Sequence, residues 1–442
     1  MNDRHILQKE KFVNYWDVLV YLLGICSVFF HIAVFEGYSE ILTFGLLLAL
    51  GLFIFRGENQ RYFLIAFSLN VFAAVLQGTI FFHVNGEPFA GGGDDRYFYD
   101  QAIKMIDGRK VKLGNYWVYL YINYGIYSIG EFLGFTDFSY LNIGYSNAFV
   151  GATIAPCMNN IVRKYFNEYY AKKTVYFVLF FPILISYSGL LLRDIWVAAI
   201  FVWIMHIVLS DTSVAVKIIL CLFCFYLSFG FRVATAVVSA LFFLSYAFYG
   251  LKSWWLKFSI GAVLVFLFFA FFYQNIVAVQ DVMADKYQGL AQAVASDNSL
   301  GAKFVHSNNP VVKGIYFIIL LYNPVPPYRS FVADDLFVAV GATIWYFVLP
   351  GFVLGIFKAM KDAKMKRFAF AFATSVVVLL IALFTIAADE RHKLLMYAPA
   401  IFFYVYYLQQ YTARFRARLL FIYCCVVALL VLVYLVMKFQ LI

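Results

Sequence analysis

Long apolar runs separated by short polar stretches make up most of the chain. A helix needs about twenty apolar residues to cross the hydrocarbon of a bilayer, and fewer where flanking side chains reach the interface. By that length the sequence predicts about thirteen transmembrane helices, to within two. The predicted spans cover residues 15–35, 41–55, 62–84, 141–162, 175–192, 195–209, 214–230, 233–249, 256–272, 336–357, 368–387, 395–408 and 419–437. The expected fold is all-α, a polytopic helical bundle that forms one integral membrane domain over residues 1–442.

The composition supports a membrane protein. Apolar side chains make up 64% of the chain and charged ones only 13%, whereas a water-soluble protein carries about 25% charged residues. The 34 basic residues exceed the 24 acidic ones, but they lie in short clusters between apolar runs, a pattern typical of cytoplasmic loops. No nucleic-acid partner is expected. The six cysteines fall mostly in apolar segments, so the Cys221–Cys224 pair predicts no metal site.

The basic clusters also predict the orientation, because loops rich in lysine and arginine face the cytoplasm. All of these clusters lie on one side only if the apolar stretch 117–133 does not span the membrane. That stretch contains Asn123, Glu131 and several aromatic side chains, so we expect it to lie flat in the outer interface. The N-terminus is then cytoplasmic, and the first apolar run is an anchor rather than a cleaved signal. The clusters lie near the N-terminus and at 56–61, 163–173, 252–257, 358–367 and 414–418.

Two outer loops hold much of the polar sequence in this orientation. The first, with its interfacial helices, covers residues 85–140, and the larger second one covers 273–335. The second loop contains Asn-Pro-Val-Pro-Pro followed by Tyr328 and Arg329. Its prolines cannot continue a helix, so we expect a rigid re-entrant turn that presents these two side chains to a substrate. A purely structural turn explains the segment equally well.

Three glycines precede two adjacent carboxylates, Asp94 and Asp95, in the first outer loop. Glycine allows the backbone to turn tightly beside a ligand, and a helical pattern follows from Tyr97. Either aspartate would act as the general base that takes the proton of an acceptor hydroxyl while that hydroxyl attacks a sugar carbon. The alternative is helix capping in a solvated loop. The two adjacent aspartates could also bind a divalent metal ion, although their spacing does not establish such a site.

Isolated cations interrupt three apolar regions on the outer side. Arg193 stands beside Asp194 in SGLLLRDIWVAA, Arg232 lies in SFGFRVATA, and Arg391 and His392 lie at the outer end of another predicted span. Ionisable groups in apolar sequence are costly and are kept where they pair, face a cavity or bind a ligand. Because the planar guanidinium binds phosphate through paired hydrogen bonds, we expect these residues to hold a lipid pyrophosphate. Pairing with a neighbour or with lipid headgroups is the alternative.

The first outer loop resembles that of the C-type (GT-C) membrane glycosyltransferases, which use polyprenyl-phosphate-linked sugars on the outer leaflet. Their loop carries a pattern like G-D-x-x-x-[YF]-x-x-x-A, which Gly93, Asp94, Phe98 and Ala102 fit. The interfacial segment 117–133 is similar to the arrangement in that family. The resemblance implies a GT-C-like fold with Asp94 at the acidic position.

Later segments resemble the O-antigen and exopolysaccharide polymerases of the Wzy type. The SYSGLLLRDIWVAA run, the Asn-Pro-Val-Pro-Pro segment and Arg391-His392 carry this similarity. Such polymerases join oligosaccharide repeats carried on undecaprenyl pyrophosphate, and outward arginines are implicated in holding the pyrophosphates. The resemblance implies that role for Arg193 and, more weakly, for Arg232 and Arg391. We expect no large soluble domain after the last predicted span, and arginine-rich repeated loops are not obvious, so single-sugar transfer and block polymerisation both stay open. A ligase shares this chemistry and stays open as well.

These features predict a multi-pass glycosyltransferase of the bacterial inner membrane whose active site faces the periplasm. Its partners would be undecaprenyl-(pyro)phosphate-linked glycan donor and acceptor, the lipid bilayer and other polysaccharide-assembly membrane proteins. No cofactor is expected, because the donor already stores the bond energy. The alternative is a transporter or flippase of lipid-linked saccharide. Transporters of the inverted-repeat kind place charges near mid-membrane and show matching halves, and this sequence shows neither feature.

Overall fold

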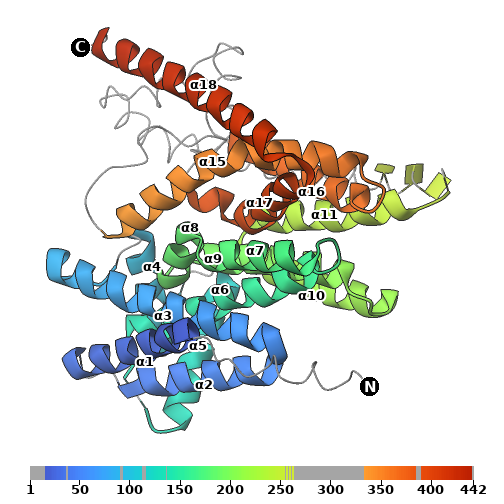
Figure 1. Ribbon diagram of the computed structural model, residues 1–442. Coiled ribbons are helices and arrows are strands. Elements are labelled where there is room, and N and C mark those ends of the chain that lie inside the picture. The colour runs from blue at the N-terminus through green and yellow to red at the C-terminus, as the bar shows by residue number, and fades with distance from the viewer. Residues whose placement is uncertain are drawn as a thin grey trace, which may run out of the picture.

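The structure is a computed structural model that describes residues 15–35, 38–89, 93–111, 116–135, 137–253, 333–384 and 390–440, with isolated residues between 255 and 262. This part of the chain contains fifteen α-helices and no strand (Figure 1). The first helices are α1 (Tyr15–Phe35), α2 (Tyr38–Ile54), α3 (Gly57–Asn85), α4 (Gly93–Ile106), α5 (Trp117–Phe132), α6 (Tyr140–Val162), α7 (Glu168–Leu179) and α8 (Pro182–Gly189). They are followed by α9 (Asp194–Leu209), α10 (Val214–Phe231), α11 (Val233–Gly250), α15 (Ala333–Lys361), α16 (Lys366–Phe384), α17 (Glu390–Gln410) and α18 (Ala413–Gln440).

Five described helices are long and apolar enough to cross a membrane, which supports an integral membrane protein. They are α1, α3, α10, α11 and α15, and the shorter helices α2 and α9 are also apolar. The predicted number of thirteen spans is not confirmed by this set, and the predicted span 256–272 lies almost entirely outside the described residues.

The predicted span 175–192 is wrong as a single helix. In the structure α7 ends at Leu179 and α8 begins at Pro182. Proline lacks a backbone N–H and disfavours helical backbone in the residue before it, and Phe181 accordingly has the extended conformation (φ −76°, ψ 111°). The chain therefore reaches Arg193 through two short helices.

Helix α6 lies at the centre of the described bundle, where it packs against α2, α3, α7, α8 and α9. Nearly all of its side chains are buried. Small residues let its neighbours approach closely: a Cβ atom added to Gly151 would lie 2.1 Å from the Ser188 hydroxyl of α8. Larger side chains at Gly151 would push α8 outward, together with the segment that leads to Arg193.

Helix α5 (teal) runs across the direction of α1 and α3 in Figure 1. It has 16 residues, with Tyr119 and Asn123 on its buried face and Ile129 and Phe132 exposed. It is not among the described helices that meet the length and hydropathy of a span. This direction is the one expected for a helix that lies in the plane of the membrane surface.

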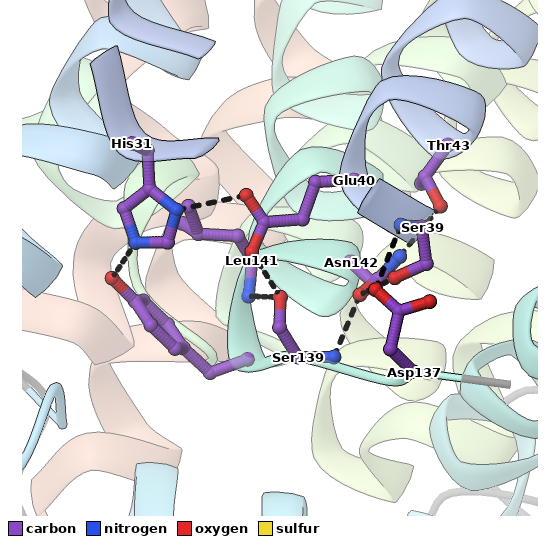
Figure 2. A network of polar contacts seen from close by, with 9 residues as sticks. His31, Ser39, Glu40, Thr43, Asp137, Ser139, Leu141 and Asn142 are labelled. Carbon is purple, nitrogen blue, oxygen red and sulfur yellow. Dashed lines mark hydrogen bonds and ion pairs between the residues drawn. The ribbon is translucent and has the colours of Figure 1, made fainter. Parts of the chain in front are cut away.

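A buried polar network joins the α1–α2 hairpin to the start of α6 (Figure 2). His31 Nδ1 lies 2.8 Å from Glu40 Oε2, and its Nε2 lies 3.1 Å from the Tyr140 hydroxyl. The Ser139 hydroxyl donates to Glu40 Oε1 at 2.6 Å. Both members of the His31–Glu40 pair are at most 1% exposed. The His31–Glu40 contact joins α1 to α2, and the bonds from Tyr140 and Ser139 hold this hairpin on α6. No role was predicted for it from the sequence.

Asn142 extends the same network along α6. Its amide nitrogen donates to the Thr43 hydroxyl at 2.7 Å, and its oxygen accepts from the Ser39 hydroxyl at 3.2 Å. The same oxygen accepts the backbone N–H of Ser139 at 2.8 Å, and the Ser139 hydroxyl accepts the backbone N–H of Leu141 at 3.1 Å. These reciprocal bonds form a capping box at the start of α6. The helix therefore begins at a fixed residue beside the hairpin.

Candidate functional site

Asp94 and Arg391 meet in the structure although 297 residues separate them in sequence. Asp94 lies in the first turn of α4, and Arg391 lies in the first turn of α17. Arg391 Nη1 donates to Asp94 Oδ2 at 2.6 Å, and the two side chains are 31% and 57% exposed. Residues of α4 and of α17 therefore belong to one site, which remains open on the Asp94 side.

Arg193 lies against two aromatic rings beside this pair. Its guanidinium carbon is 5.6 Å from the ring centre of Phe98 and 5.7 Å from that of Tyr116. Such cation–π contacts stabilise a cation that has lost part of its water. Phe98 stands one helical turn after Asp94 on α4, so the helix that carries the exposed aspartate also supports Arg193.

Burial lowers the pKa of Arg193 from 12.5 to about 10. The neighbouring Arg232 and Arg391 add to this lowering, and Asp194 and Asp94 oppose it. All four charged residues therefore lie within electrostatic reach of Arg193. Burial therefore disfavours the charged form of Arg193, and an anion beside it would offset part of that cost.

Arg232 enters the cluster through an ion pair. Its Nη2 lies 2.8 Å from Asp194 Oδ1, with side chains that are 22% and 3% exposed. Arg232 has extended backbone and separates α10 from α11, and Asp194 is the first residue of α9. A buried carboxylate needs such a partner, so this pair fixes the start of α9 directly after Arg193.

Asn147 of α6 holds the segment that leads into Arg193. Its amide nitrogen donates to the carbonyl oxygens of Leu190 (2.6 Å) and Leu192 (3.1 Å) and lies 3.0 Å from the Tyr119 hydroxyl. The indole nitrogen of Trp196 donates to the Asn147 oxygen at 2.7 Å. Asn147 is fully buried, so one side chain joins α5, α6, α9 and the α8–α9 connection. Asn147 was not predicted from the sequence, where its signal was an amide in the middle of an apolar run.

The two adjacent aspartates occupy different environments. Asp95 is 0% exposed, whereas Asp94 is more than half exposed. Burial, with smaller contributions from Asp95 and Asp194, raises the pKa of the Tyr119 hydroxyl above its ordinary value of 10.0. Asp95 therefore faces the interior near Tyr119, and Asp94 is the aspartate that a substrate in solution reaches.

Three other predicted site residues are not placed by the structure. Tyr328 and Arg329 lie outside the described residues, and the side chain of His392 is not described although the residue belongs to α17. Its neighbour Lys393 is 1% exposed. Within the described ranges no group of three or more His, Cys, Asp or Glu side chains is arranged to hold a metal ion.

The cluster combines one accessible carboxylate with three guanidinium groups, and Arg232 and Arg391 form ion pairs with Asp194 and Asp94. Such an arrangement binds anions with several oxygens and keeps a proton acceptor beside them. No protein family, curated protein or solved structure matches the chain. The site is therefore the basis for assigning a function.

Proposed function

We propose that the chain is a membrane glycosyltransferase that uses undecaprenyl-(pyro)phosphate-linked saccharide at the periplasmic face of the bacterial inner membrane. Its proposed reaction is the polymerisation of oligosaccharide repeats of a surface polysaccharide. The observation that carries the proposal is the contact between Asp94 and Arg391 with Arg193 within electrostatic reach of both. These groups supply a base and a phosphate site in one place.

In the proposed reaction the donor pyrophosphate binds Arg391 and Arg193. A bidentate phosphate contact draws Arg391 away from Asp94, which leaves that carboxylate free to accept the proton of the acceptor hydroxyl. The hydroxyl oxygen forms a bond to the anomeric carbon while the bond from that carbon to the pyrophosphate oxygen breaks. The pyrophosphate leaves on its lipid with the bonding electrons, and the arginines stabilise its charge.

The contacts assign narrower roles to the other charged residues. Arg232 is paired with the buried Asp194, so it supports the start of α9 and acts on the donor only through the field it adds at Arg193. Asp95 is enclosed and serves the interior of the site rather than the acceptor. We therefore propose Asp94 alone as the proton acceptor.

The position of the cations favours an enzyme over a transporter or flippase of lipid-linked saccharide. Arg193 precedes α9, Arg232 separates α10 from α11, and Arg391 lies in the first turn of α17. All three stand at helix ends, whereas alternating-access transporters bind their substrates near the bilayer midplane. A ligase that moves finished polymer would share this chemistry, as would a single-sugar GT-C enzyme.

The test is Asp94→Asn in the native host, followed by electrophoresis of the surface polysaccharide. Loss of the base predicts that the chain-length ladder collapses to single repeats. A flippase predicts loss of the single repeat as well, and a ligase predicts that polymer accumulates on the carrier lipid. Asp100→Asn is the matched control, because Asp100 is an exposed carboxylate on the same helix. An unchanged ladder in Asp94→Asn, at equal protein level, would remove Asp94 from the mechanism.

A further inference from the structure

A groove of about 310 Å³ lies between α15, α17 and α18, in a part of the chain that the proposed reaction does not use. Its walls are mostly apolar, with Phe347 and Gly351 from α15, Tyr404 and Tyr407 from α17, and Leu420 from α18. Gly351 has no side chain to fill the space, and a Cβ atom added there would lie 2.6 Å from the Tyr404 ring. The groove therefore depends on a close approach of α15 and α17.

Arg416 of α18 is the charged residue that lines this groove. Its side chain is partly buried, and its Nε atom is enclosed without a hydrogen-bond partner. Among the described residues no carboxylate forms an ion pair with it. An enclosed donor without an acceptor is unfavourable, so the guanidinium is suited to an anion that enters the groove.

The groove lies at the start of α18, where basic residues are clustered. Arg416 stands in the first turn of α18, close in sequence to Arg414 and Arg418, and α15 ends with Lys358 and Lys361. Such clusters are expected to face the cytoplasm. Beyond its first turns α18 (red) runs away from the rest of the bundle in Figure 1, and its side chains Phe421, Leu429 and Leu432 are exposed. The groove therefore opens beside apolar surface that borders the cytoplasmic leaflet.

We propose that this groove binds an anionic phospholipid of the cytoplasmic leaflet. The lipid phosphate accepts hydrogen bonds from Arg416, and an acyl chain lies against Phe347 and Leu420. A single cation at the polar end of an apolar groove matches a molecule that has one phosphate joined to a hydrocarbon chain. The surrounding lysines and arginines favour a negatively charged headgroup over a zwitterionic one.

Native mass spectrometry and thermal unfolding of the full-length protein in detergent test this proposal. We expect phosphatidylglycerol to stay bound and to raise the unfolding temperature more than phosphatidylcholine does. Arg416→Gln should weaken phosphatidylglycerol binding roughly tenfold, because it removes charge-assisted hydrogen bonds. Arg414→Gln is the matched control, since Arg414 is exposed on the same helix turn and does not line the groove.

A second variant separates loss of the groove from loss of charge. Ala417 also lines the groove, so Ala417→Phe should fill it and release the lipid while Arg416 remains in place. Equal phosphatidylglycerol binding by wild type, Arg416→Gln and Ala417→Phe would overturn the proposal. Stabilisation by inorganic phosphate equal to that by phosphatidylglycerol would also overturn it, because the acyl chain would then contribute nothing. The lipid measurements do not depend on the polysaccharide ladder.

Discussion

Arg193 and Arg232 lie in the same cluster, yet removing their charges should change stability in opposite directions. The pKa of Arg193 is lowered from 12.5 to about 10, which corresponds to roughly 3 kcal/mol of unfavourable charge burial at neutral pH. The folded state carries this penalty below pH 10, and the penalty disappears as the pH rises towards 12.5. Arg193→Met removes the charge and keeps most of the length. Its loss of two cation–π contacts offsets roughly 1 to 2 kcal/mol, which leaves a net stabilisation of roughly 1 to 2 kcal/mol.

Arg232→Met should instead destabilise the protein. Its partner Asp194 is 3% exposed, so the substitution leaves a buried carboxylate without its 2.8 Å ion pair. Breaking a buried pair from one side destabilises by about 3 kcal/mol or more. The two substitutions are chemically identical and lie within one cluster, so general effects of arginine removal cancel in the comparison.

Thermal unfolding of the three proteins in one detergent, followed by tryptophan fluorescence at neutral pH, measures both effects. The unfolding temperature should rise by a few degrees in Arg193→Met and fall by several in Arg232→Met. Inorganic pyrophosphate should raise the unfolding temperature of the wild type and have little effect on Arg193→Met. A lower unfolding temperature in Arg193→Met would show that burying the Arg193 charge costs less than roughly 3 kcal/mol, and the argument for an anion site would fail.

Three further substitutions test other parts of the structure. Asn147→Ala removes the hydrogen bonds that hold the chain before Arg193, so we expect a loss of about 2 kcal/mol or more in thermal unfolding and shorter polysaccharide chains. Asn147→Asp should not restore them, because a carboxylate has no N–H to donate. A hydrogen bond from Tyr406 lowers the pKa of Asp362 below its ordinary 3.8. This carboxylate therefore stabilises the fold above about pH 4, and its contribution is lost as the pH falls below that value. Asp362→Asn should make the unfolding temperature less sensitive to acid over that range. Glu40→Ala leaves His31 buried beside a void and should lower the free energy of unfolding by about 3 kcal/mol. A coupling energy near zero between Glu40→Ala and His31→Leu in a double-mutant cycle would contradict an interaction between the two residues.

The sequence predicted the position of a helix or residue where a single rule, such as hydrophobic length or the placement of basic residues, was sufficient. Hydrophobic length predicted the helices that became α3, α10 and α11, and it also located the helix now seen as α6. The basic clusters predicted that residues 117–133 do not span the membrane, and this stays a prediction although α5 runs across the direction of α1 and α3. The same rule placed Asp94 and Arg391 on one face, and the structure brings them into contact.

Prediction failed where a local break or a distant partner decided the outcome. Pro182 divides a largely apolar run, and hydropathy alone does not register that break. Asn147 and the His31–Glu40 pair are single polar positions within apolar runs, and their partners lie about a hundred residues away or on another helix. The thirteen predicted spans and the GT-C-like fold stay predictions, because hydrophobic length does not fix how a helix is tilted, broken or laid on the surface.

The His31–Glu40 pair bears on the order in which the protein assembles during synthesis. Tyr140 and Ser139 leave the ribosome about a hundred residues after the pair they contact. Over that interval a lone carboxylate at the start of α2 would resist entry into lipid, whereas Glu40 already has His31 as a hydrogen-bonding partner within the hairpin. The α1–α2 hairpin can therefore insert by itself, and its hydrogen bonds with the start of α6 form only after α6 has been synthesised.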